Sequence, residues 1–183
     1  QYLQTVPTRD NEWDRRHVPY EIANAEHLAM SESAGMINLS HFAIMDIKGS
    51  DAERMLEYLS VAKVGDNTPE GRVIYTNFLD EDGGVHADLT ISRMGNDYYR
   101  VVTGGADGNR DWVTLRNYRD DHGLEADINI RTHDIATLGL WGPHAERALG
   151  HFIDPGEINI GNFPFVTAKE LTLKLPHGKT IEV

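Results

Sequence analysis

The residues best suited to chemistry lie on one strand-like run, in which an aspartate alternates with two hydroxyl side chains. Asp88, Thr90 and Ser92 fall on one face of this run, because side chains alternate along a strand. A carboxylate in such a setting can accept hydrogen bonds, orient a ligand nitrogen or move a proton. With Tyr75 on the preceding run, these residues predict the lining of a polar ligand cavity rather than a surface facing bulk water.

Asp88 also has a structural interpretation. A lone acid in a strand often binds backbone amides at a sheet edge or pairs with an arginine, here Arg72 or Arg93. Such pairing shifts pKa values and so resembles a functional site. The residue pattern by itself favours this structural interpretation.

The element that must position Asp88 is the stretch 71–103. Residues 73–79 are β-branched and aromatic, and Gly83 and Gly84 can turn the chain because glycine accepts a positive φ. Residues 85–94 then alternate as a second strand, and a third strand leads to Thr103. The pattern predicts a three-stranded antiparallel meander.

Helices and strands flank this meander on both sides. Before it, the spacing predicts a helix over 20–33, one or two short strands over 36–48 and a helix over 52–59 that begins with a Ser50–Glu53 capping box. After it, the spacing predicts a helix over 109–118 and a strand over 126–131. A second unit is expected from Ile135, and it contains a strand over 166–175 and a strand from Thr180 that are joined by a turn at 176–178. This order favours an α+β fold with a largely antiparallel sheet.

Other motifs carry less weight. The connection 103–109 is rich in glycine and could hold an anion at a helix start, but it fits neither dinucleotide nor P-loop spacing and is more simply a turn. The nine histidines are scattered, so no metal site is expected. No serine hydrolase triad can be identified around Ser40 and His41.

Composition excludes some partners. The chain has 183 residues and a formal net charge of −12, which repels the phosphates of nucleic acids. It has no cysteine, no apolar run long enough to span a membrane and a polar N-terminal stretch unlike a signal peptide, so we expect a cytoplasmic protein. The first residue is Gln and the last four are strand-like, from which we expect a fragment of a longer protein.

Five segments in order resemble the folate-binding region of the glycine-cleavage T-protein (aminomethyltransferase) family. They are GMINLSHFAIMDIKGSDAERMLEYL, GRVIYTNFLDEDGGVHADLTI, YYRVVTGGADGNRDWV, LGLWGPHAERAL and NFPFVTAKEL. The segments WDRRH, ANAEH and LWGP are closer to the T-protein-like half of FAD-dependent dimethylglycine and sarcosine dehydrogenases.

This resemblance implies tandem ferredoxin-like units around a tetrahydrofolate site, incomplete at the C-terminus. It divides the chain into an extended arm at 1–19 and a folate-binding domain at 20–183. It implies that Asp88 is the catalytic acid and that Tyr75 contacts the folate. The positions that flank the folate's ring systems fall on Phe42, Thr90, Val101 and Thr103.

The implied activity is transfer of an aminomethyl or methylene carbon to tetrahydrofolate, giving 5,10-methylenetetrahydrofolate. FAD would belong to a partner or to a preceding domain that oxidises an N-methyl amine. Two alternatives remain open: a folate-binding or assembly module without transfer activity, and a tetrahydrofolate-dependent S- or O-demethylase. The family's usual first acid is Ala87 here and its usual asparagine is Thr103, so the orientation of the folate can differ.

Overall fold

The computed structural model describes residues 19–65, 68–154, 156–159 and 161–183, which form two compact units. Of the described residues, those within 39–137 and 159–171 form the sheet unit, and those within 19–38, 138–158 and 172–183 form the terminal unit. The arm predicted at 1–19 lies outside the described residues except for Pro19, where the first helix starts.

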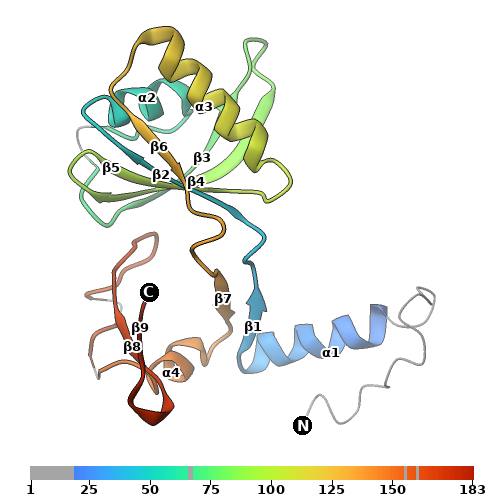
Figure 1. Ribbon diagram of the computed structural model, residues 1–183. Helices are drawn as coiled ribbons and strands as arrows, with labels where there is room; N and C mark the ends of the chain where they lie inside the picture. The colour runs from blue at the N-terminus through green and yellow to red at the C-terminus, as the bar shows by residue number, and fades with distance from the viewer. Residues whose placement is uncertain (1–18, 66–67, 155, 160) are drawn as a thin grey trace. The chain divides into compact units, whose positions relative to one another are not determined.

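The sheet unit is built on one five-stranded sheet (Figure 1). Its strands in chain order are β2 (Ala43–Lys48), β3 (Val73–Leu79), β4 (Val85–Gly95), β5 (Tyr98–Thr103) and β6 (Asp127–Ile130). In space the order is β3-β4-β5-β2-β6, and each neighbouring pair is antiparallel. The predicted meander is therefore confirmed as β3, β4 and β5.

Two helices, α2 (Ala52–Leu59) and α3 (Gly108–His122), cover one face of this sheet (Figure 1). Their buried side chains join the inward residues of the strands in one core. Its largest fully buried hydrophobic members are Met45, Ile47, Met55, Leu56, Phe78, Ile91, Tyr99 and Leu115. The helix-covered face is apolar, so polar chemistry on this sheet belongs mainly to its other face.

The order β2-α2-β4-β5-α3-β6 is that of a ferredoxin-like unit, with β3 added at the edge beside β4. The predicted α+β class with a largely antiparallel sheet is confirmed. Successive strands can pair as neighbours here because the β3–β4 and β4–β5 connections are short.

The β3–β4 hairpin is closed by Asp80, whose Oδ1 accepts hydrogen bonds from the amides of Asp82 (3.1 Å) and Gly84 (2.6 Å). Gly83 has a φ of 82° in this turn, a conformation that costs glycine little. The turn predicted at these glycines is confirmed.

The predicted capping box at the start of α2 is wrong. The N-cap residue is Asp51, and its side chain makes no capping hydrogen bond. Ser50 donates instead to Glu125 (3.1 Å), and Glu53 accepts a hydrogen bond from the buried Tyr99 hydroxyl (2.7 Å). The side chains that the cap would need are therefore used by long-range partners, and the bond between Glu53 and Tyr99 connects α2 to β5.

The terminal unit contains short elements. They are α1 (Pro19–Glu32), β1 (Gly35–Asn38), β7 (Leu138–Trp141), α4 (Ala145–Leu149), β8 (Thr172–Lys174), the 3₁₀ turn η2 (Pro176–Gly178) and β9 (Thr180–Glu182). The described strands pair antiparallel in twos, β1 with β7 and β8 with β9. The turn predicted between β8 and β9 is confirmed.

The strand predicted over 166–175 is shorter than expected. Val166 has a φ of 56°, outside the β region, and its carbonyl accepts a hydrogen bond from Val73 in the sheet unit. Only Thr172–Lys174 is a strand. Segment 159–171 therefore belongs to the sheet unit, and the chain returns to the terminal unit at Thr172.

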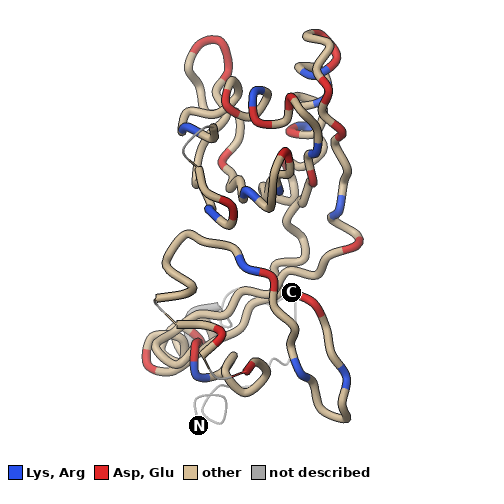
Figure 2. The backbone as a smooth tube through the Cα atoms, turned by 90° about the vertical axis from the view of Figure 1, so that its left-hand side faces the viewer, with Lys and Arg blue, Asp and Glu red and all other residues tan. Residues whose placement is uncertain are grey.

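Acidic residues are distributed along the chain in both units rather than gathered in one segment (Figure 2). None of the helices in the described part of the chain has the length and apolar character needed to span a bilayer.

Candidate functional site

The candidate site lies on the polar face, which we define as the side of the five-stranded sheet turned away from α2 and α3. Alternation and strand register assign its residues. On β3 and β4 it carries Tyr75, Asn77, Asp88, Thr90 and Ser92. The sequence-based expectation that Asp88, Thr90 and Ser92 share one face with Tyr75 therefore agrees with the register.

Tyr75 and Asp88 form a hydrogen-bonded pair near the β3 edge of this face. The Tyr75 hydroxyl donates to Asp88 Oδ2 over 3.0 Å, and 65% of Tyr75 is exposed. Register explains the contact, because Tyr75 lies opposite Thr90 and Asp88 lies diagonally across, within reach of a long side chain. The hydrogen bond to Asp88 raises the pKa of the Tyr75 phenol, and the charge of the carboxylate adds to this effect.

The sequence suggested that Asp88 could pair with Arg93, but Arg93 has other partners. That arginine donates to the Thr68 carbonyl (2.8 Å) and lies 3.6 Å from Glu53. Asp88 is an exposed residue whose hydrogen bond goes to a phenol rather than to a cation. One of its oxygens is held by Tyr75, and the other can accept a proton or a hydrogen bond from a ligand.

Phe42 directly precedes β2 and is half-buried, and its ring lies edge-on against His41 with 5.0 Å between ring centroids. Phe42 lies in a bend outside the strand, so strand alternation does not assign it to a face. The register pairs Ala43 with Thr103 and Thr103 with Leu89, which places Phe42 at the same end of the sheet as Asp88.

Val101 and Thr103, which the resemblance placed beside the folate's ring systems, lie on the opposite face of the sheet from Tyr75 and Asp88. The register pairs Thr103 with Leu89 and Val101 with Ile91, all of which face the helices. Val101 is fully buried and Thr103 is 3% exposed. Both are covered by protein on the helix side.

Thr103 has a structural partner in α3. Its hydroxyl donates to Asp111 Oδ2 over 2.6 Å, and Asp111 is fully buried. Arg110 Nε donates to the other oxygen of that carboxylate over 3.2 Å. This contact connects the end of β5 to the first turn of α3, and it explains a hydroxyl residue at position 103 without a ligand.

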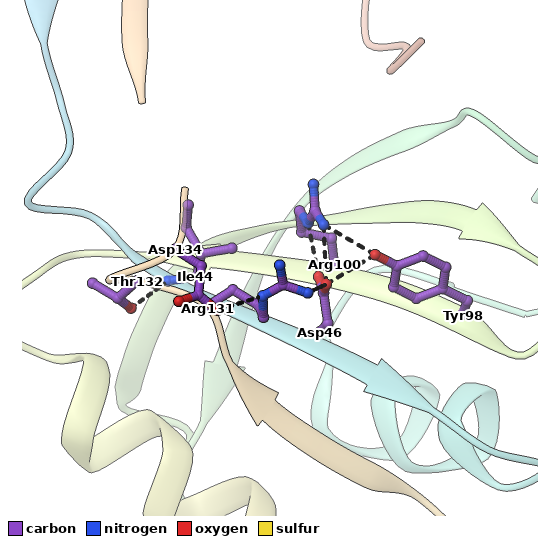
Figure 3. Close-up of polar contacts among 7 residues, drawn as sticks. All are labelled: Ile44, Asp46, Tyr98, Arg100, Arg131, Thr132 and Asp134. Carbon is purple, nitrogen blue, oxygen red and sulfur yellow. Dashed lines mark hydrogen bonds and ion pairs between the residues drawn. The ribbon is translucent and has the colours of Figure 1, made fainter. Parts of the chain in front are cut away.

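Sequence reasoning missed a second polar group on the same face, centred on Asp46 of β2 (Figure 3). Asp46 is only 2% exposed, and Arg100 of β5 lies directly opposite it in the register. Arg100 donates from Nε to Oδ1 (2.7 Å) and from Nη2 to Oδ2 (3.0 Å), while the Tyr98 hydroxyl donates to Oδ2 over 2.9 Å. The paired bonds fix the guanidinium on the polar face.

Arg131, just after β6, completes this group, which we call the Asp46 cluster: Asp46, Tyr98, Arg100 and Arg131. Its Nη1 lies 3.5 Å from Asp46 Oδ2, and its Nε donates to Asp134 over 3.0 Å. The backbone amide of Arg131 donates to the Ile44 carbonyl, so the chain after β6 stays next to β2. Figure 3 shows Tyr98 and Arg100 of β5 and Arg131 after β6 converging on the Asp46 carboxylate.

Electrostatics keep this carboxylate ionised. Burial by itself raises the pKa of Asp46, but hydrogen bonds from Arg100 and Tyr98 and the charges of Arg100 and Arg131 outweigh burial, and the net pKa is lowered. The pKa of Arg100 is raised, chiefly by its hydrogen bonds to Asp46. Burial and the bond to Asp46 raise the pKa of the Tyr98 phenol.

A weak signal for this cluster was present in the sequence. Asp46 interrupts the apolar strand residues 43–47, and Arg100 interrupts a run of aromatic and β-branched residues at 98–102. A charge inside a strand that is otherwise apolar implies a partner of opposite charge. Pairing the two strands correctly would have identified that partner.

Two hollows lie in the terminal unit, and none of the predicted site residues lines them. One of about 360 Å³ is lined by His27, Met30, Ser31, Ile37 and Trp141. Another of about 500 Å³ is lined by residues between Pro143 and Ile158. Among the described residues, no group of three or more His, Asp or Glu side chains is arranged to hold a metal ion.

Comparisons with known proteins agree with the fold. The sequence matches the family described as GCVT N-terminal domain over residues 4–177. The fold is similar to that of the glycine cleavage system aminomethyltransferase T from Bartonella henselae, with a TM-score of 0.64 and 24% identity over 69% of this chain and 34% of that chain. This chain therefore spans about a third of that relative.

A second similar structure is a chain of the heterotetrameric sarcosine oxidase from Corynebacterium sp. U-96, solved with pyrrole 2-carboxylate. The TM-score is 0.57 and the identity is 14%, over 90% of this chain and 77% of that chain. At these identities the two structures demonstrate a shared fold.

Proposed function

The chain belongs to the GCVT N-terminal domain family, and on this basis we propose that it binds tetrahydrofolate and takes part in the transfer of a one-carbon unit to it. The observation that carries the proposal is the Tyr75–Asp88 pair, an exposed phenol hydrogen-bonded over 3.0 Å to an exposed carboxylate on the polar face. We assign the transfer role to Asp88 and the ligand contact to Tyr75.

The residues of this face fit such a ligand. A pteridine is a flat ring system edged with N–H donors and ring acceptors, and the exposed Tyr75 ring offers a surface for stacking. Asp88 can accept hydrogen bonds from N–H groups, and the Thr90 hydroxyl can donate or accept. Phe42, directly before β2, can add apolar surface at the same end of the sheet.

Val101 and Thr103 have a different part in this proposal. Because both lie beneath the helices, we propose that they support the site through the core and through the bond between Thr103 and Asp111. Direct contact with the ligand is assigned to Tyr75, Thr90 and Phe42.

Tetrahydrofolate supplies nucleophilic nitrogens that accept carbon at the oxidation level of formaldehyde. The part of this chain is to orient those nitrogens and to handle their protons. Asp88 Oδ2 is held by Tyr75, so Oδ1 is the atom that accepts an N–H hydrogen bond or a proton. A positioned carboxylate of this kind contributes roughly 10²–10⁴ to a rate as an acid or base.

We further propose that the carbon comes from an N-methyl amine oxidised by an FAD-dependent dehydrogenase domain or subunit, and that the product is 5,10-methylenetetrahydrofolate. The similarity to a chain of the heterotetrameric sarcosine oxidase supports a partner, because that enzyme is assembled from several subunits. The motifs WDRRH, ANAEH and LWGP support the dehydrogenase branch. FAD is assigned to that partner and not to this chain.

The test compares the full-length protein with Asp88→Asn, using formation of methylenetetrahydrofolate as the readout. A matched control is Asp82→Asn, an exposed acid in the β3–β4 turn. We expect Asp88→Asn to lower the transfer rate by roughly 10²-fold or more, while Asp82→Asn stays within a factor of two of the parent.

Equal turnover in the parent and in Asp88→Asn would remove Asp88 from the mechanism. Tight tetrahydrofolate binding with no transfer by the full-length protein, even with a flavoprotein partner and an N-methyl amine, would favour a binding or assembly module. Transfer from a sulfur or oxygen methyl donor, and not from an amine, would favour a demethylase.

A further inference from the structure

The Asp46 cluster contains two arginines whose hydrogen-bonding capacity exceeds what the protein uses. A guanidinium has five N–H donors. Arg100 uses Nε and Nη2 for Asp46 and Tyr98, and among the described residues its Nη1 group makes none of the hydrogen bonds found. Figure 3 shows a terminal nitrogen of Arg100 pointing away from Asp46.

Arg131 has the same surplus at a neighbouring position. Its Nε is used by Asp134 and its Nη1 approaches Asp46, while within the described part of the chain Nη2 has no hydrogen-bond partner. Both arginines approach Oδ2 of Asp46, so the two guanidinium groups adjoin the same carboxylate oxygen. About a quarter of the Arg100 side chain and 40% of the Arg131 side chain are exposed.

The formal charges around these arginines balance, so the preference for an anion rests on the unused N–H donors of Arg100 and Arg131. Lys48 adds a third cation, with its Nζ 4.1 Å from the centre of the Tyr98 ring. The opposing acids are Asp46, which is buried among the cations, and Asp127 and Asp134, which are exposed at the rim. Lys48 and these two acids are all exposed, so water screens their charges alike.

We propose that the free edges of Arg100 and Arg131 form a subsite for the carboxylate of a small-molecule ligand. Asp46 and Tyr98 hold Arg100 in place before the ligand arrives, so little side-chain freedom is lost on binding. A carboxylate accepts two parallel N–H bonds from such donors.

The position of this subsite relative to Asp88 limits the ligand. Arg100 lies opposite Ser92 in the register, and Asp88 is four residues from Ser92 on the same strand face. Strand geometry then separates the Asp88 and Arg100 Cα atoms by about 14 Å. This part of the inference rests on the proposed function, because it takes Asp88 as the reacting end of the site.

Two ligands could supply the carboxylate. One is the glutamate end of tetrahydrofolate, which the aminobenzoyl linker separates from the pteridine, and the other is the carboxylate of an N-methyl amino acid donor. The separation from Asp88 suits the longer molecule if a single ligand contacts both places. A small amino acid would contact Arg100 alone.

The experiment measures binding by calorimetry to the full-length protein and to two variants, Arg100→Lys and Arg131→Gln. Arg100→Lys keeps a positive charge beside Asp46 but removes the guanidinium N–H donors that would bind the carboxylate of the ligand. Arg116→Gln on α3 is the control, because Arg116 lies over the Trp112 ring on the helix side. The ligands are tetrahydrofolate, a tetrahydropterin without the aminobenzoylglutamate, N-methylglycine and dimethylamine.

If the glutamate end binds here, Arg100→Lys and Arg131→Gln weaken tetrahydrofolate binding by roughly 10- to 100-fold and leave the tetrahydropterin within twofold. If the donor binds here, the same variants weaken the binding of N-methylglycine by that factor and leave the binding of dimethylamine unchanged. Arg116→Gln changes neither.

The subsite is overturned if the two variants weaken the binding of ligands with and without a carboxylate equally. It is also overturned if binding is unchanged in both variants, or if the parent binds no carboxylate ligand. Failure of the proposed function looks different. In that case Asp88→Asn leaves tetrahydropterin binding and transfer unaltered, whereas a loss of N-methylglycine binding in Arg100→Lys still supports the subsite.

Discussion

Replacing Asp46 by asparagine should destabilise the sheet unit strongly, because it removes the only buried acid among the cations of the Asp46 cluster. The substitution keeps the shape of the side chain and one carbonyl acceptor. It removes the charge that receives two hydrogen bonds from Arg100 and one from Tyr98. The guanidinium of Arg100 is then left partly buried without a counter-ion.

The magnitude follows from the burial of each partner. Removing one member of a buried ion pair costs about 3–5 kcal/mol. Here Asp46 is 2% exposed, but the side chains of Arg100 and Arg131 are 26% and 40% exposed, so water compensates part of the loss. We expect a decrease of about 2–3 kcal/mol in the free energy of unfolding, which corresponds to about 4–12 °C in Tm for a chain of this size.

The assay is urea unfolding followed by far-UV circular dichroism, with amide exchange of β2 and β5 to assign the loss to the sheet unit. Asp134→Asn is the matched control, because Asp134 pairs with Arg131 in the same region but its side chain is 60% exposed. We expect the control to lose less than about 0.5 kcal/mol.

The effect should also depend on pH. The pKa of Asp46 is lowered in the folded protein, so its contribution to stability is complete above the unfolded carboxyl pKa of about 3.9 and is lost as the pH falls through the lower folded value. The difference between the parent and Asp46→Asn should be constant from about pH 7 to pH 5 and shrink below about pH 4. Equal losses in Asp46→Asn and Asp134→Asn, or a difference that grows in acid, would refute this reasoning.

Three further predictions concern the phenol pair, the core and one glycine. In Asp88→Asn, the pKa of Tyr75 should fall toward its ordinary value because the carboxylate that raises it is gone, so one phenol titrates at lower pH in ultraviolet absorbance. Leu115→Ala should cost about 2–5 kcal/mol of unfolding free energy, since this side chain is fully buried, while Val113→Ala on the same helix should cost under about 1 kcal/mol. Gly49→Ala should lower Tm by several degrees, because its φ is +143° and a Cβ would lie 2.2 Å from the Glu125 carbonyl oxygen.

Each of these has an outcome that contradicts it. An unchanged phenol titration in Asp88→Asn would mean that the Tyr75 hydrogen bond is absent in solution. If Leu115→Ala and Val113→Ala lose similar amounts of unfolding free energy in urea, the two side chains are buried to a similar extent, which contradicts the prediction. Gly95→Ala, at a glycine with open space around it, is the control for Gly49→Ala, and equal Tm values for these two variants would refute the steric argument.

Local patterns in the sequence determined the elements of the sheet unit. Alternation predicted the meander, and glycine chemistry predicted the turn at Gly83 and Gly84. The same alternation placed Asp88 and Thr90 together on one face with Tyr75 nearby, because the side-chain period of a strand is a local property. Helices α2 and α3 also followed from apolar spacing, although α3 extends to His122, four residues beyond the expected end.

The terminal unit depended on contacts that no local pattern contains. β1 pairs with β7, whose residues lie about 100 positions later in the chain, and segment 159–171 returns to the edge of the sheet unit. The capping box failed for the same reason, because Ser50 and Glu53 found partners on distant elements.

For the candidate site, the sequence by itself determined that Asp88 has polar neighbours and an adjacent tyrosine. Only the tertiary structure decided that Thr103 faces the helices, because register pairs it with Leu89 and a shift of one residue would have moved it to the other face. Only the tertiary structure brought Arg100 opposite Asp46, since the two residues are 54 positions apart. The alternation of side chains is fixed within each strand. Which strands pair, and which face of the sheet the helices cover, is fixed by long-range packing.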